Sequence, residues 1–104
     1  MTTTATLLRA AHAADERGEV RDAWLLVEDG RIAAVGSGRD PGALPPAAEV
    51  VDLGDATLVP GFIDLHGHGA GGHAYDDGGD ELRAALAAHR AHGTTRSVVS
   101  LVTN

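Results

Sequence analysis

The order of elements in the C-terminal half of the chain constrains the fold most. Residues 62–66 form a mostly apolar run, as expected for a strand buried on both faces of a parallel sheet. Residues 67–79 are rich in glycine and aspartate, which predicts a loop. A helix is expected over 80–92, because apolar residues recur at helical spacing and Gly93 is a typical stop. Together with the β-rich segment 94–103, this order predicts one βαβ unit, the repeating element of parallel α/β folds.

The N-terminal half reads as short strands without a helix. Asp29-Gly30 separates two apolar runs, 23–27 and 32–35. An Asp-Gly pair in this setting is a strong hairpin signal, because a tight hairpin turn needs positive φ at its centre. We interpret residues 15–19 as a polar interruption with a turn glycine. Further strands are expected at 4–13, 49–53 and 56–59, and a loop at 36–46.

Composition excludes several classes of protein. The chain has 104 residues, whereas a (β/α)₈ barrel typically needs about 250. Its net charge of −7 argues against a basic nucleic-acid-binding surface. The absence of cysteine excludes disulfides and thiolate metal sites. No stretch approaches the roughly 18 apolar residues of a membrane helix, and the N-terminus does not resemble a signal peptide, so we expect a cytoplasmic protein with no membrane partner.

His66-Gly67-His68 is the most informative chemical feature. Residues i and i+2 of a strand point to the same face, so two imidazoles at the end of a strand can reach one cation. Imidazole suits zinc, iron and nickel, and in barrels the carboxyl end of the strands carries the active site. A His-x-His pair also occurs by chance. The apolar strand before this pair and the glycine-rich loop after it favour metal binding.

Other polar residues of this region have two readings each. Asp64 lies two residues before His66 and either orients an imidazole by a hydrogen bond or is a plain polar strand residue. His73 either assists a metal or lines a substrate pocket, or is a solvated loop histidine, which is the favoured reading. The run 69–72 fits a flexible active-site loop better than a phosphate cradle. A structural role is favoured for His12, His89 and His92.

Residues 58–68, Leu-Val-Pro-Gly-Phe-Ile-Asp-Leu-His-Gly-His, resemble the first barrel strand of the amidohydrolase superfamily. Within it the chain is most similar to the N-acetylglucosamine-6-phosphate deacetylase family. The similarity rests on the glycine run 69–72 with Tyr75-Asp76-Asp77, and on the passage from His92-Gly93-Thr94-Thr95 to 100–103.

This resemblance implies an incomplete α/β structure in two parts. Residues 1–59 would be the N-terminal part of a small β-sandwich, and residues 60–104 the first βαβ unit of a TIM-type (β/α)₈ barrel. His66 and His68 would bind a divalent metal, zinc or iron, and Asp64 and His73 would lie near the site. The implied reaction converts N-acetylglucosamine 6-phosphate and water to glucosamine 6-phosphate and acetate. The implied partners are this small-molecule substrate and, for the full-length enzyme, further copies of itself.

The resemblance also implies that most of the catalytic machinery lies beyond Asn104. The family's remaining metal ligands and its general acid or base follow later barrel strands, so no catalytic residue is assigned here. We therefore expect the chain alone to be inactive.

Three alternatives remain. One is another amidohydrolase, such as a cyclic amidase similar to dihydroorotase or hydantoinase. The second is a β-rich binding module without enzymatic activity, although an isolated βαβ unit leaves strand edges unpaired. The third is a metal-binding protein that uses several of the six histidines.

Overall fold

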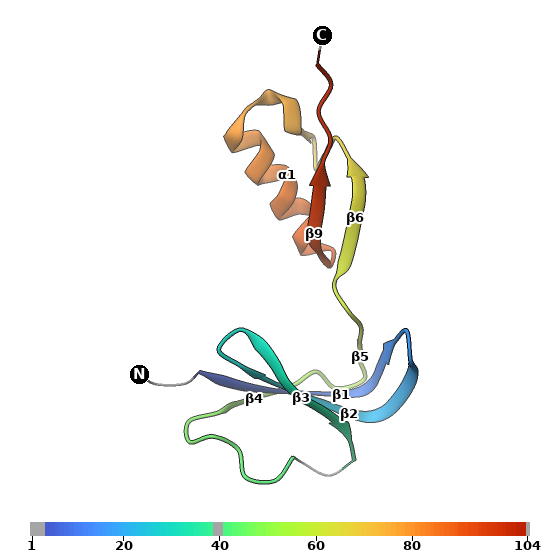
Figure 1. Cartoon of the computed structure of the whole chain (residues 1–104), viewed down its shortest axis with the longest axis vertical. Helices are drawn as coiled ribbons and strands as arrows, with labels where there is room; N and C mark the ends of the chain where they lie inside the picture. The colour runs from blue at the N-terminus through green and yellow to red at the C-terminus, as the bar shows by residue number, and fades with distance from the viewer. Residues whose placement is uncertain (1–3, 39–40, 104) are drawn as a thin grey trace. The chain divides into compact units, whose positions relative to one another are not determined.

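The structure is a computed structural model that describes residues 4–38 and 41–103. The chain forms two compact units, Met1–Pro60 and Gly61–Asn104, which we call the N-terminal and C-terminal units. Strands dominate the first unit, and the second combines strands with a helix (Figure 1). The chain is thus a mixed α/β structure rich in sheet.

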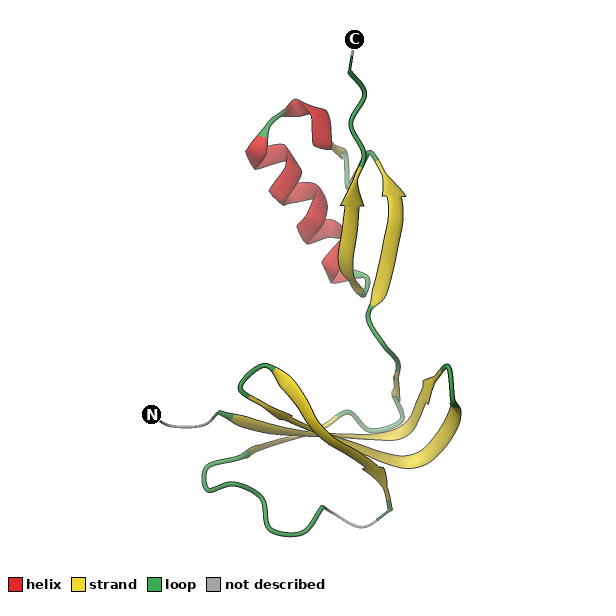
Figure 2. Ribbon diagram, viewed as in Figure 1, coloured by secondary structure: helices red, strands yellow, loops and turns green. Residues whose placement is uncertain are grey.

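One sheet of five strands makes up the N-terminal unit (Figure 2). The order is β3-β2-β1-β4, and β5 also pairs with β1. The first three strands are antiparallel neighbours, whereas β4 and β5 run parallel to β1. The strands are β1 (Ala5–Asp15), β2 (Gly18–Glu28), β3 (Arg31–Ser37), β4 (Glu49–Asp52) and β5 (Thr57–Leu58).

The turn between β2 and β3 confirms the predicted hairpin. Asp29 has φ 48° and Gly30 has φ 76°, which are the positive values that a tight two-residue turn requires. The interruption predicted for residues 15–19 is shorter than expected. β1 continues to Asp15 and β2 already begins at Gly18, so that segment is the tip of a second hairpin.

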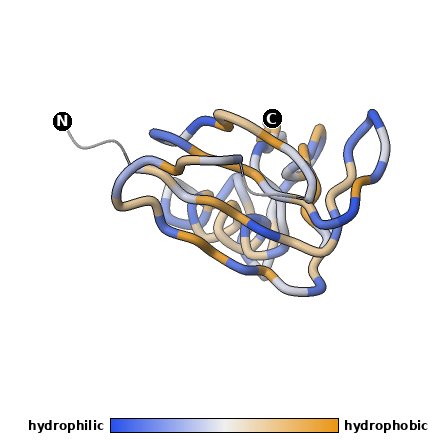
Figure 3. The backbone as a smooth tube through the Cα atoms, turned by 90° about the horizontal axis from the view of Figure 1, so that it is seen from below, coloured by the Kyte–Doolittle hydropathy of each residue, from blue (hydrophilic) through white to orange (hydrophobic). Residues whose placement is uncertain are grey.

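The core of the N-terminal unit is small. Its fully buried apolar residues come from β1 and β2, where Leu7 is 1% exposed and pairs directly with Leu26. Burial of one leucine contributes about 1.5–3 kcal/mol, so this pair is a main source of stability. Hydrophobic and hydrophilic residues are interspersed along the chain (Figure 3), consistent with strands that have one exposed face.

The C-terminal unit confirms the predicted βαβ order. β6 and β9 are parallel neighbours, and α1 connects them through the intervening segment. The helix lies beside this strand pair (Figures 1 and 2). The elements are β6 (Phe62–Gly67), β7 (Gly69–Ala70), β8 (His73–Ala74), the 3₁₀ turn η1 (Tyr75–Asp77), α1 (Gly79–Ala91) and β9 (Thr94–Val99).

Helix α1 follows the predicted bounds within one residue. Asp80 and Glu81 lie in its first turn and Arg90 in its last, as the helix dipole favours. Ala85 is fully buried, and Gly93, with φ 97°, ends the helix as expected. In the part of the chain that the structure describes, no helix combines the length and apolar character needed to cross a membrane.

The expectation that residues 62–66 are buried on both faces was wrong for this chain. Ile63 is 62% exposed and Leu65 is 75% exposed. The cause is the small number of neighbours, since among the described residues β6 pairs with β9 alone. The strand therefore has the composition of a central strand but lacks the cover of one.

Candidate metal centre

The side chains of His66 and His68 converge at the end of β6. His66 lies within the strand and His68 directly follows it. Their Nε2 atoms are 3.1 Å apart, and their rings meet edge to face with centroids 4.9 Å apart. Both residues are exposed.

The separation of the two Nε2 atoms suits joint ligation of one ion. Two imidazole nitrogens bound to one zinc ion at about 2.0–2.1 Å lie about 3.3 Å apart in tetrahedral geometry. The separation of 3.1 Å is close to that value. Neutral imidazoles at this distance also share one hydrogen bond, in which one Nε2 atom carries a proton. Ligation of one ion by both nitrogens therefore removes that proton from Nε2 but needs little movement of the rings.

Ser100 contacts the other nitrogen of His66. Its Oγ atom lies 3.2 Å from Nδ1 of His66, across the β6–β9 pair. The backbone N–H of Ser100 donates to the carbonyl oxygen of Gly67 at 3.0 Å, which fixes the serine beside the histidine. We did not single out Ser100 from the sequence. Its place just after β9 was the available signal, because parallel strands end at the same edge of a sheet.

Asp64 contacts the backbone and the helix. Its Oδ1 atom accepts a hydrogen bond from the backbone N–H of His66 at 3.2 Å, and its Oδ2 atom lies 3.9 Å from Nε2 of His89. Within the described residues no hydrogen bond joins Asp64 to the imidazole of His66 or His68. The carboxylate therefore holds the backbone N–H of His66 and faces α1.

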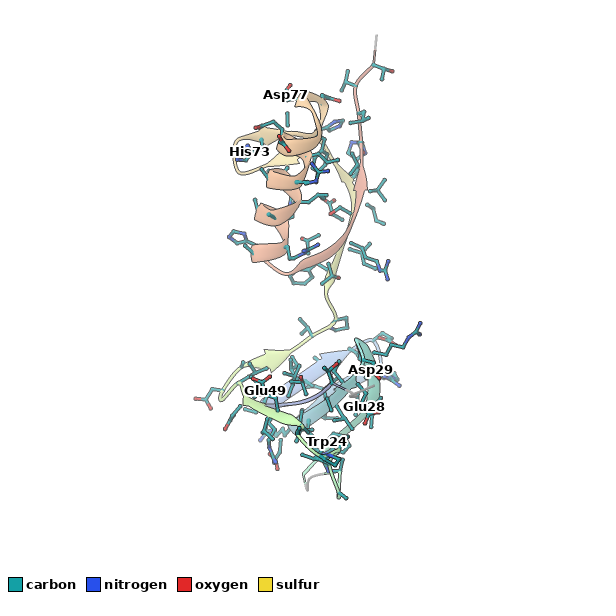
Figure 4. The ribbon with its side chains drawn as sticks, turned by 90° about the vertical axis from the view of Figure 1, so that its left-hand side faces the viewer. Trp24, Glu28, Asp29, Glu49, His73 and Asp77 are labelled. Carbon is teal, nitrogen blue, oxygen red and sulfur yellow. The ribbon has the colours of Figure 1, made fainter. Side chains whose placement is uncertain are left out.

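His73 pairs with the start of the helix. Its Nδ1 atom is 2.7 Å from Oε2 of Glu81, and both side chains are about two-fifths exposed at 40% and 42%. Figure 4 shows His73 beside α1. The reading of His73 as a solvated loop residue was therefore incomplete, because a hydrogen bond to Glu81 holds its side chain.

The glycine-rich segment is a hairpin, which corrects the loop predicted for residues 67–79. β7 and β8 pair antiparallel around Gly71 and Gly72. These glycines have φ values of 60° and 84°, the pattern of a tight turn with both central residues at positive φ. The turn explains the two adjacent glycines without a phosphate ligand.

The remaining histidines have structural contacts, as favoured from the sequence. His89 Nε2 lies 3.2 Å from the carbonyl oxygen of Gly69, and His92 Nδ1 lies 2.9 Å from that of Ala88. His12 Nδ1 lies 3.4 Å from a carboxylate oxygen of Glu19. Over residues 4–38 and 41–103, no three histidine, aspartate or glutamate side chains gather in a metal-binding arrangement. The candidate centre thus offers two potential ligands among the described residues, His66 and His68.

Comparison with known proteins gives relatives that cover part of the chain. It is 48% identical over 48 residues to imidazolonepropionase of Salinispora arenicola, covering 46% of this chain and 12% of that protein. It is 43% identical over 51 residues to dihydroorotase of Mycobacterium tuberculosis, covering 49% of this chain and 11% of that protein. No family model matches the chain.

A solved structure matches nearly the whole chain. It is N-acetyl-D-glucosamine-6-phosphate deacetylase of Mycobacterium smegmatis, a D267A mutant in complex with N-acetyl-D-glucosamine-6-phosphate. The TM-score is 0.83 and the identity 41%, over 97% of this chain and 26% of that protein. The chain therefore spans about a quarter of that structure and about a tenth of the two relatives above.

Proposed function

Since this chain is related to the N-acetylglucosamine-6-phosphate deacetylases of the amidohydrolase superfamily, we propose that it forms part of a metal-dependent deacetylase. The proposed reaction is hydrolysis of the N-acetyl group of N-acetylglucosamine 6-phosphate, which yields glucosamine 6-phosphate and acetate. The observation that carries the proposal is the convergence of His66 and His68 Nε2 at 3.1 Å. This pair lies at the carboxyl end of a strand in a chain that is 41% identical to such a deacetylase.

His66 and His68 would hold a divalent ion, zinc or iron. Their nitrogen donors fit these metals, and their separation fits ligation of one ion. When bound, the ion would lower the pKa of water and polarise the substrate carbonyl. The residues of this chain would provide the pair of donors and the Asp64 contact that holds the backbone N–H of His66.

The C-terminal unit would be the first βαβ element of a TIM-type barrel, and the N-terminal sheet would be part of a β-sandwich. The exposed side chains of Ile63 and Leu65 support this proposal, because a barrel strand is covered on both faces. Two histidines make a weak site on their own. The remaining ligands and the general acid would come from outside these residues, so the chain alone would not turn over substrate.

Zinc titration of the purified chain tests the metal site. Calorimetry should detect binding that His66→Ala and His68→Ala each abolish and His92→Ala leaves unchanged. His92 is the matched control because it is exposed and bonds within its own helix. Equal zinc binding by all four proteins would refute a site at His66 and His68.

Acetate release tests the reaction. The coding sequence after Asn104 is read, and a protein extended by any further histidine and glutamate ligands is assayed with N-acetylglucosamine 6-phosphate and zinc or iron. We expect turnover by the extended protein and none by the 104-residue chain. Turnover by the short chain, or none by an extended chain that binds metal, would contradict the proposal.

A second candidate is a cyclic amidase. The 43% identity to dihydroorotase over 51 residues favours it, because this match lies within the same superfamily. The two candidates share the metal pair and differ in substrate. Assaying the extended protein with dihydroorotate and hydantoins beside the amino-sugar phosphate separates them.

A further inference from the structure

Ser100 and His66 are brought together by the register of β6 and β9. Gly67 pairs with Val99, and the backbone N–H of Ser100 then donates to the carbonyl oxygen of Gly67. This places the Ser100 hydroxyl 3.2 Å from Nδ1 of His66, although the two residues are 34 positions apart. The backbone hydrogen bond holds the main chain of Ser100 in place. The side-chain hydroxyl is not used in that bond and can hydrogen-bond to the imidazole of His66.

The role of the Ser100 hydroxyl, as donor or acceptor, is linked to which nitrogen of His66 is protonated. A neutral imidazole has one N–H donor and one acceptor nitrogen, and a ligating nitrogen must carry no proton. A hydroxyl that accepts from Nδ1–H leaves the lone pair of Nε2 free. That Nε2 atom is the one that lies 3.1 Å from Nε2 of His68.

We infer that Ser100 is a positioning residue that orients the His66 ring and holds its proton on Nδ1, so that Nε2 ligates the metal. Asp64, the residue suggested for such a role by the sequence, bonds to the backbone N–H of His66 instead. The inference rests on the proposed metal site and adds to it the residue that selects the ligating nitrogen. Outer partners of this kind typically change metal affinity by 10- to 100-fold.

Zinc alone is the probe for this inference. The chain is titrated with zinc as wild type and as Ser100→Ala, Ser100→Thr and His66→Ala. Ser97→Ala is the matched control, because Ser97 lies on β9, the strand that Ser100 directly follows. Circular dichroism first verifies the fold of each variant. ¹⁵N-correlated NMR of the zinc-loaded proteins then reports which ring nitrogen carries the proton and how fast that proton exchanges.

We expect Ser100→Ala to weaken zinc binding by about tenfold and to speed exchange of the His66 Nδ1 proton. Ser100→Thr retains the hydroxyl and should restore both, whereas Ser97→Ala should change neither. Wild-type affinity and exchange in Ser100→Ala would overturn the role of Ser100 while leaving the metal site intact. Zinc binding that His66→Ala does not affect would overturn the metal site and this inference together.

Discussion

His89 in α1 contacts Gly69 in β7, with Nε2 of the imidazole 3.2 Å from the carbonyl oxygen of the glycine. The same nitrogen lies 3.9 Å from the carboxylate of Asp64 in β6. One partly buried side chain thus joins the helix to the strand that carries His66 and to the hairpin that follows His68. The stability of the C-terminal unit should depend on it.

His89→Ala should lower the free energy of unfolding by about 1 kcal/mol, the usual contribution of one hydrogen bond. His89→Gln keeps an N–H donor at a similar reach and should lose less. Urea denaturation followed by circular dichroism measures both. The control is Arg83→Ala, which removes an exposed side chain of the same helix and should change stability by no more than about 0.5 kcal/mol. Equal losses in His89→Ala and Arg83→Ala would refute the contact.

Gly69→Ala should destabilise the chain by about 2 kcal/mol or more. A Cβ atom at Gly69 would collide with the backbone carbonyl oxygen of His73, which cannot move without breaking the β7–β8 pair. Gly79→Ala is a control for which we expect a gain in stability. Its Cβ would lie at an ordinary 3.4 Å from Arg83, and alanine favours a helix over glycine, so thermal unfolding should shift upward. Destabilisation of similar size in both variants would contradict this account.

Local patterns predicted the elements well where one residue type determines the geometry. Asp29-Gly30 indicated its hairpin, and Gly93 indicated the end of α1, because positive φ is costly for most other residues. The β1–β2 hairpin lacks a glycine at the centre of its turn. Its turn depends on the Asp15 side chain, which accepts a hydrogen bond from the backbone N–H of Arg17 at 2.8 Å. This sequence signal is weaker than Asp-Gly, and it does not distinguish a hairpin turn from an interruption between strands.

The sequence predicted only the part of the candidate site that depends on spacing between neighbouring residues. Strand periodicity placed His66 and His68 together. The partners of these histidines depend on how distant segments align, and composition does not determine that alignment. Ser100 reaches His66 through the β6–β9 register, and Asp64 faces His89 because α1 lies against the β6–β9 strand pair. Neither contact follows from periodicity alone.

Tyr75→Phe should leave stability unchanged or raise it by up to about 1 kcal/mol. Tyr75 is 4% exposed, and its hydroxyl has no hydrogen-bond partner among the described residues, so the wild type bears the cost of a buried, unpaired polar group. Tyr75→Ala removes the ring and should cost about 3 kcal/mol, which tests that the ring itself is packed. Chemical denaturation measures both variants. A loss above about 1 kcal/mol in Tyr75→Phe would mean that the hydroxyl is bonded.

Arg17→Gln should raise the pKa of the Asp15 carboxyl toward its ordinary value. The Arg17 guanidinium donates to that carboxylate at 2.8 Å, and this hydrogen bond is the main cause that holds the pKa of Asp15 below the usual range. A carboxyl with a lowered folded-state pKa stabilises the fold above its unfolded-state pKa. That contribution disappears as the pH falls through the lowered value. A ¹³C NMR titration of the Asp15 carboxyl measures the shift directly.

Glu16→Gln is the matched control, because it changes a neighbouring charge but keeps the hydrogen bond, and it should leave the pKa of Asp15 low. An unchanged Asp15 titration in Arg17→Gln would show that the guanidinium does not hold this turn in solution.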